Sequence, residues 1–252
     1  MSEWFKVQLS KSCVGKPTAS SNLALSATPR RAGNIIHGMG RVASVNVGEP
    51  RPVQYRGHAV MTAIWKAPVA GRVALRGVNL AGDRQADLRV HGGPDKAVYA
   101  YAVEDLAWWA VELERGMEPG VFGENLTTSG IDVTQAVVGE RWRIGETILE
   151  VAQPRSPCFK LGIRMGDQKF IRRFLAAERP GAYLRVLNEG DIGAGDTVEV
   201  VGRPLHGVTI REVNHALMID PAGAARLLLA TELPEPILEW ARQEVDADAS
   251  PP

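Results

Sequence analysis

The sequence predicts a mainly β protein: a closed or nearly closed β-barrel with a few helices and a small three-helix appendage at the C-terminal end. Short apolar stretches recur between residues 41 and 201, and glycine-containing turns separate them. Two amphipathic segments interrupt this series. Closing a sheet of many short strands removes its exposed edges, so such a series favours a barrel.

Hydrophobic spacing defines the expected helices and strands in order. Residues 103–115 form the first expected helix, because Leu106 and Trp109 share one face while acidic residues occupy the other. Residues 167–178 form the second, with the same spacing of apolar side chains. The expected strands are 41–47, 59–65, 72–76, 97–101, 141–143, 147–152, 182–187 and 197–201.

The C-terminal part of the chain is predicted to be helical. Thr209 followed by Glu212 is a capping box, and Asp220 followed by Pro221 is a second helix start. A third helix opens after residue 233 and runs through Trp240. The expected division is a leader or early start (1–38), the barrel (39–202), the three-helix domain (203–246) and a disordered tail (247–252).

The first 38 residues differ in composition from the rest. They are basic, rich in serine and poor in hydrophobic periodicity. This composition is typical of a disordered leader, of a transit peptide, or of a start codon assigned too early. We favour disorder, with Met39 as the effective start, and assign no function to Cys13.

Composition excludes several classes of protein. The chain has 252 residues, and its 29 basic and 29 acidic residues cancel. The long-range basic field that attracts nucleic acid is therefore missing. The sequence contains no apolar run long enough to span a bilayer. Two cysteines are too few for a disulfide framework or a multi-cysteine zinc site, and a reducing cytosol is the expected compartment.

The segment from Gln153 to Lys160 carries the strongest chemical signal. Two prolines stiffen this loop, and Arg155 and Lys160 flank Cys158. Cationic neighbours favour the thiolate, which is both a nucleophile and a metal ligand. The alternative is a buried, inert thiol that behaves as a small hydrophobe.

Three further segments suggest a ligand site, although each is weak alone. The turn at Gly92 and Gly93 exposes backbone N–H groups, and Lys96 adds a positive charge for an anion such as phosphate. A tight turn with a charged rim is the alternative. Glu124 and Asn125 offer acceptors and donors for the edge of a heterocycle, or else form a turn that caps a strand.

The last of the three is a strand on which Tyr183 and Arg185 share one face. An outward polar face of the barrel is the alternative for this pair.

The adjacent Trp108 and Trp109 cannot both face the core from one helix. Either one of them stacks on a heterocyclic substrate, or Trp109 packs in the core and Trp108 is partly covered.

Together these segments resemble the MOSC domain family, and more closely its bacterial stand-alone YiiM-type members. The resemblance runs from about Met39 to the end of the chain. It rests on Gly82-Asp83-x-Gln85-x-Asp87, His91-Gly92-Gly93-x-Asp95-Lys96-Ala97-Val98-Tyr99, Phe122-Gly123-Glu124-Asn125-Leu126-Thr127, Gln153-Pro154-Arg155-x-Pro157-Cys158-x-Lys160-Leu161 and Gly181-x-Tyr183-x-Arg185-Val186-Leu187.

The resemblance implies a pyruvate-kinase-barrel-like fold that binds molybdenum cofactor through one cysteine, here Cys158. A thiolate suits molybdenum, which is bound by the sulfur donors of the pterin dithiolene. His91 and Asp87 are the expected proton donors, by residue type. The expected cofactor-binding residues are Gly92, Gly93, Lys96, Phe122, Gly123, Glu124, Asn125, Arg155, Lys160, Tyr183 and Arg185.

The implied activity is reduction of small N-hydroxylated compounds, such as hydroxylamino purines, to amines. Two electrons and two protons convert N–OH into N–H and water. The chain has no dinucleotide fingerprint and no cysteine set for an iron–sulfur cluster, so a separate reductase is the expected electron donor. A homodimer is left open.

Two other functions stay open on the same residues. In the first, Cys158 carries a persulfide and transfers sulfur, as the fusion of MOSC domains to pyridoxal-phosphate desulfurases suggests. Pyridoxal phosphate itself is not expected, because no desulfurase domain fits within this chain. In the second, the protein carries the molybdenum cofactor without turnover.

Overall fold

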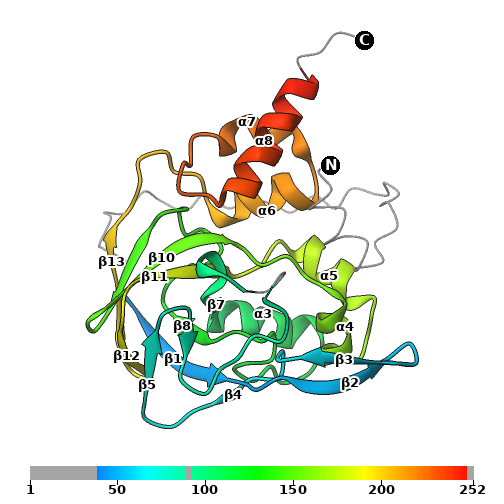
Figure 1. Ribbon diagram of the computed structural model, residues 1–252, viewed down its shortest axis with the longest axis vertical. Helices are drawn as coiled ribbons and strands as arrows, with labels where there is room; N and C mark the ends of the chain where they lie inside the picture. Colours follow the sequence, from blue (N-terminus) through cyan, green and yellow to red (C-terminus); the bar gives the residue numbers. More distant parts are fainter. Residues whose placement is uncertain (1–38, 89–91, 249–252) are drawn as a thin grey trace.

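The computed structural model describes residues 39–88 and 92–248. The predicted leader and most of the predicted tail lie outside these residues, as do Cys13 and His91. The mainly β architecture predicted from the sequence is confirmed, and the C-terminal helices lie together at one end of the molecule (Figure 1). No described helix has the length and apolar character needed to cross a membrane.

Seven strands close into a barrel. In the order β13-β9-β10-β11-β7-β8-β1, each strand pairs with the next, and β13 also pairs with β1. All these pairs are antiparallel except β7 with β8, which is parallel. The strands are β1 (Met39–Val47), β7 (Val98–Ala102), β8 (Leu126–Ser129), β9 (Arg141–Ile144), β10 (Thr147–Pro154), β11 (Ala182–Asn188) and β13 (Thr197–Gly202).

Two smaller sheets, one of three strands and one of two, accompany the barrel in the described structure. The hairpin of β2 and β3 has the two-residue turn Arg56-Gly57, where both residues have positive φ, as a type I′ turn requires. The predicted strand 59–65 ends early, at Thr62. The remaining strands are β2 (Arg51–Tyr55), β3 (His58–Thr62), β4 (Ala67–Pro68), β5 (Arg72–Arg76), β6 (Asn79–Leu80) and β12 (Gly190–Gly193).

The wall of the barrel separates two hydrophobic clusters. Alternation along β11 buries Ala182 and Leu184 in the aliphatic cluster that fills the barrel. Tyr99 and Tyr101 of β7 belong instead to an aromatic cluster outside it. Three helices cover that outer cluster: α3 (Val103–Glu112), α4 (Phe159–Met165) and α5 (Phe170–Ala177).

The two predicted helices are present, as α3 and α5, each somewhat shorter than predicted. The short helix α4 is an addition, and it begins directly after Cys158. A hydrophobic pattern of only seven residues is too short to identify such a helix from sequence. This helix fixes where the segment that carries Cys158 leaves the barrel wall.

The C-terminal helices share their core with the barrel. The predicted capping box is confirmed, because the Glu212 N–H donates to Thr209 Oγ1 at 3.2 Å and the Thr209 N–H donates to Glu212 Oε2 at 2.8 Å. One continuous cluster of buried side chains joins the barrel interior to these helices. The elements are α6 (Ile210–Met218), the 3-10 helix η2 (Pro221–Gly223), α7 (Ala224–Leu227) and α8 (Glu235–Asp248), which ends beyond the predicted boundary.

Candidate functional site

A cavity of about 90 Å³ lies on the outer side of the barrel wall and brings together segments that are far apart in sequence. Eight of the residues predicted to form a site line it: Lys96, Phe122, Gly123, Asn125, Arg155, Cys158, Lys160 and Tyr183. Five lining residues are basic, and none of the described lining residues is acidic: Lys66, Arg84, Lys96, Arg155 and Lys160. This excess of basic side chains would favour an anionic ligand.

Cys158 is buried but lies in the cavity wall. Its side chain is 8% exposed, and its extended backbone forms the N-cap of α4. The neighbouring Phe159 ring stacks on Tyr55 of the β2–β3 hairpin, with ring centroids 4.9 Å apart. The thiol is therefore held in a rigid segment beside cationic groups rather than sealed in the hydrophobic core.

Arg155 is a buried cation without a carboxylate partner among the described residues. The residue is 6% exposed, and its guanidinium interacts with the side chains of Tyr99 and Tyr183. Its Nη1 atom is buried and has no hydrogen-bond partner in the described part of the chain. A buried unpaired guanidinium is costly. An anionic ligand in the cavity would supply the missing acceptor.

Burial also changes how the neighbouring groups titrate. It raises the pKa of Tyr99 and of Tyr183, and the Arg155 charge only partly opposes this. The two hydroxyls therefore stay protonated. Burial lowers the pKa of Lys96, against the opposing effect of Asp95. Lys96 consequently loses its charge at a lower pH than an exposed lysine.

Lys66 reaches the same cavity through a buried ion pair. Its Nζ atom lies 2.7 Å from Asp83 Oδ2. Asp83 also accepts from the Gly48 N–H at 2.9 Å and from Asn125 Nδ2 at 2.8 Å. Desolvation nevertheless lowers the pKa of Lys66. The pair fixes the position of this lysine, because removal of either partner would leave a buried charge.

Glu124 and Asn125 have partners within the protein. Glu124 is fully buried and accepts from the N–H groups of Gly120 at 2.6 Å and Phe122 at 3.0 Å. Asn125 Oδ1 accepts from the Tyr99 N–H at 3.1 Å, and its Nδ2 group is engaged as well. If these two side chains bound the edge of a heterocycle, as predicted from the sequence, they would have to give up some of these hydrogen bonds. Both side chains shape the loop that forms the cavity wall.

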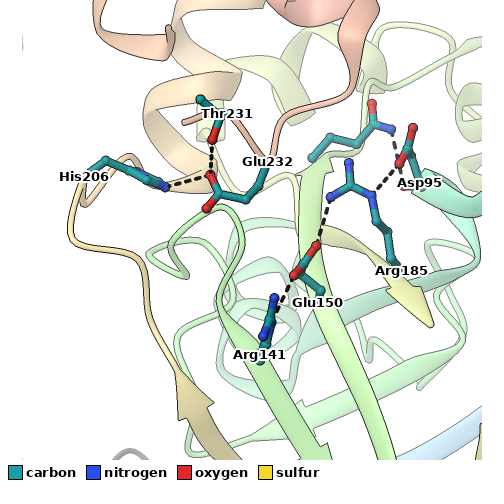
Figure 2. A network of polar contacts seen from close by, with 8 residues as sticks. Asp95, Arg141, Glu150, Arg185, His206, Thr231 and Glu232 are labelled. Atoms are coloured by element: carbon teal, nitrogen blue, oxygen red, sulfur yellow. Dashed lines mark hydrogen bonds and ion pairs between the residues drawn. The ribbon is translucent and has the colours of Figure 1, made fainter. Parts of the chain in front are cut away.

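Arg185 lies outside the cavity, in an ion-pair network. Its Nε atom is 2.5 Å from Asp95 Oδ1, and its Nη1 atom is 3.2 Å from Glu150 Oε1 (Figure 2). Glu150 also pairs with Arg141 at 3.1 Å. The structure thus separates Arg185 from Arg155, although both were predicted to bind the cofactor.

The segment between Asp87 and Gly93 is only partly described. Gly93 has a φ of 95° and caps the 3-10 helix η1 (Pro94–Lys96), which presents Lys96 to the cavity. Asp87, Gly92 and Gly93 are not among the residues that line the cavity. The predicted roles of Asp87 and His91 as proton donors stay predictions, and His91 lies outside the described residues.

Eight of the residues that line the cavity were not predicted as site residues, and Lys66, Gln85 and Tyr99 are among them. Gln85 donates from Nε2 to the Lys96 carbonyl at 3.2 Å, while its Oε1 atom is buried and unpartnered in the described structure. Tyr99 and Gln85 both lie in the quoted motifs, so a signal was present for them. The sequence gives no comparable signal for Lys66, which is a single charged residue in an apolar stretch.

The two tryptophans on α3 do not line this cavity. Trp109 is 1% exposed and packs in the aromatic cluster. Trp108 is partly buried, and the Arg179 guanidinium lies 4.7 Å from its ring centroid. The core-packing alternative therefore describes Trp109, and neither indole is placed to stack on a ligand of the Cys158 cavity.

A comparison with known proteins identifies relatives over most of the chain. The MOSC domain family model matches residues 87–199. Protein YflK of Bacillus subtilis, itself described as uncharacterized, is 37% identical over 69% of this chain and 78% of its own length. A protein named reductase from Gibberella moniliformis is 30% identical over 71% of this chain, which corresponds to 32% of the reductase.

A solved structure supports the same relationship. The crystal structure of YiiM from Geobacillus stearothermophilus has a TM-score of 0.67 and 28% sequence identity to this protein. The match covers 81% of this chain and 98% of YiiM. The similarity therefore extends over nearly the whole of the smaller protein, barrel and appendage included.

Proposed function

The chain belongs to the MOSC domain family, and from this premise we propose that its basic cavity binds a molybdenum–pterin cofactor that serves the reduction of N-hydroxylated compounds to amines. The observation that carries the proposal is the buried Nη1 atom of Arg155, which has no hydrogen-bond partner among the described residues and lies in a cavity that also contains Cys158. The similarity to a protein named reductase supports an oxidoreductase.

The residues present fit such a cofactor. A thiolate of Cys158 is a soft ligand suited to molybdenum. The described residues contain no cluster of three His, Cys, Asp or Glu side chains that would hold a metal by themselves. The phosphate of the cofactor would find charge-assisted donors in Arg155, Lys96 and Lys160, which are all buried or half-buried.

Each side chain has a role that follows from its surroundings. Cys158 would hold the metal, and Arg155 would bind the anion while Tyr99 and Tyr183 fix its guanidinium. The buried Oε1 atom of Gln85 would accept a hydrogen bond from an amino or ring N–H group. When bound, the cofactor supplies the two-electron reduction of N–OH to N–H and water. We propose a separate reductase as the source of these electrons.

Turnover with an artificial donor tests the activity without the unknown reductase. Protein made in cells that synthesise molybdenum cofactor is mixed with reduced viologen and 6-hydroxylaminopurine. We expect formation of adenine, measured by chromatography, with viologen oxidation in a ratio of two electrons per product. A persulfide on Cys158 without molybdenum would instead favour the sulfur-transfer function. Bound cofactor without turnover under any electron donor would favour a protein that carries the molybdenum cofactor without catalysis.

A further inference from the structure

A second group of cations lies beside the cavity, around Trp65. Arg51 begins β2, Arg115 follows α3, and Arg164 lies in α4. The Arg51 guanidinium carbon is 4.0 Å from the centroid of the Trp65 ring, and that of Arg164 is 5.7 Å from it. Three distant parts of the chain thus bring arginines to one place.

These arginines have no carboxylate partner within the described residues. The Nη2 atom of Arg115 contacts a weak acceptor, Met165 Sδ, at 3.6 Å. The Nε atom of Arg164 is buried and has no hydrogen-bond partner in residues 39–88 and 92–248. By contrast, Arg141 pairs with Glu150, and Arg185 pairs with Asp95.

The fold holds these like charges together at a cost. Desolvation lowers the pKa of Arg164, and the positive charges of Arg51 and Arg115 lower it further. The carboxylate of Glu124 opposes this effect from a distance, but its oxygens accept bonds from Gly120, Phe122 and Thr127. An anion bound among the arginines would relieve the repulsion and satisfy the Arg164 Nε–H.

The arginine group is adjacent to the cavity along two segments. Trp65 stands between Ile64 and Lys66, which both line the cavity. Arg164 follows Cys158 by six residues along α4, a rise of about 9 Å. None of the three arginines lines the cavity itself, but a molecule of moderate length bound among them could reach toward it.

We propose that Arg51, Arg115 and Arg164 form a phosphate-binding subsite, and that the substrates include phosphorylated N-hydroxylated nucleosides. This inference rests on the proposed function and names the substrate class of that site. Planar guanidinium groups match phosphate oxygens in bidentate geometry, which makes arginine the fitting residue for a phosphate monoester. The heterocycle carrying the N–OH group would then lie beside the cofactor that we propose for the Cys158 cavity.

Calorimetric titration of the full chain with adenosine 5′-monophosphate, adenosine and inorganic phosphate tests the subsite without any turnover. We expect the nucleotide to bind about tenfold more tightly than the nucleoside, as one charge-assisted interaction provides. The variants R51A and R51A/R164A should lower this preference stepwise toward one. R172A, which removes an exposed arginine of α5, is the matched control and should change nothing.

Three outcomes would overturn the subsite. They are equal affinity of the wild type for nucleotide and nucleoside, a full preference retained in R51A/R164A with pterin still bound, and a full preference retained in that variant with the pterin lost. The last would assign the arginines to the phosphate of the cofactor. R51A alters an exposed residue and so keeps the test informative if the double variant unfolds.

The subsite and the proposed function fail separately. Absence of molybdenum from the wild type would reject the function, while the nucleotide preference would still report on the arginines. Conversely, viologen-driven reduction of 6-hydroxylaminopurine with no nucleotide preference would keep the function and reject the subsite.

Discussion

Two basic regions on the outer side of the barrel differ in how their charges are compensated. In the cavity, Arg155 is buried without a carboxylate partner in the described structure and contacts two tyrosines. In the network of Figure 2, Arg185 pairs with Asp95 and Glu150. The same residue type is thus available for a ligand in one region and occupied in the other. The difference shows that a cation's neighbours, more than its identity, mark a binding site.

The largest expected effect concerns the scaffold behind the cavity. Glu124→Ala removes the acceptor of two buried backbone N–H groups, those of Gly120 and Phe122. We expect the free energy of unfolding to fall by on the order of 3 kcal/mol, since each unsatisfied buried group is costly. Denaturant unfolding measures this. Glu124→Gln keeps one acceptor oxygen, so its free energy of unfolding should fall less. Equal stability of Glu124→Ala and the wild type would show that Glu124 does not stabilise this loop.

The next effect separates the two arginines directly. Arg155→Ala should weaken cofactor retention by about ten- to a hundredfold, the value of a hydrogen bond to a charged group, with little loss of stability. Arg185→Ala should leave retention unchanged and lower the unfolding free energy by about 1 kcal/mol or less, as a partly exposed pair does. Pterin fluorescence and thermal melting report the two quantities. Equal loss of both in Arg155→Ala would mean that this arginine is structural.

A smaller effect follows from Lys96. Because burial lowers its pKa, the lysine loses its proton earlier than an exposed one as pH rises. Affinity of the cavity for inorganic phosphate should therefore fall on the alkaline side, below the pH at which ordinary lysines titrate. Lys96→Arg should flatten this fall, because arginine stays charged. Calorimetry across neutral to alkaline pH checks it, and identical profiles for the two proteins would contradict a role of Lys96 in anion binding.

The sequence predicted those parts of the site that depend on local features. Two prolines and two cations around Cys158 lie within eight residues, so their proximity is set by the covalent chain. The barrel and its helices follow from periodicity in the same way. Arg185 differs, because its partner Asp95 is 90 positions away. Whether such an arginine is free or paired depends on tertiary contacts that no local pattern records.

The missed residues have the same explanation. Lys66 reaches the cavity because its partner Asp83 lies across a loop, 17 positions further on. Glu124 has the residue type of a ligand-reading group, but the backbone folds around it and takes both of its oxygens. Hydrophobic burial could be predicted from spacing, whereas the satisfaction of polar groups could not.

The central claim is that Cys158 and the basic cavity hold a molybdenum–pterin cofactor. The molybdenum and pterin content of the wild type and of Cys158→Ser, both made in cells that synthesise the cofactor, tests it most directly. We expect near-stoichiometric metal in the wild type and almost none in the variant, with similar melting temperatures, because a hydroxyl is a poor ligand for a soft metal centre. Full molybdenum occupancy in Cys158→Ser would contradict the account.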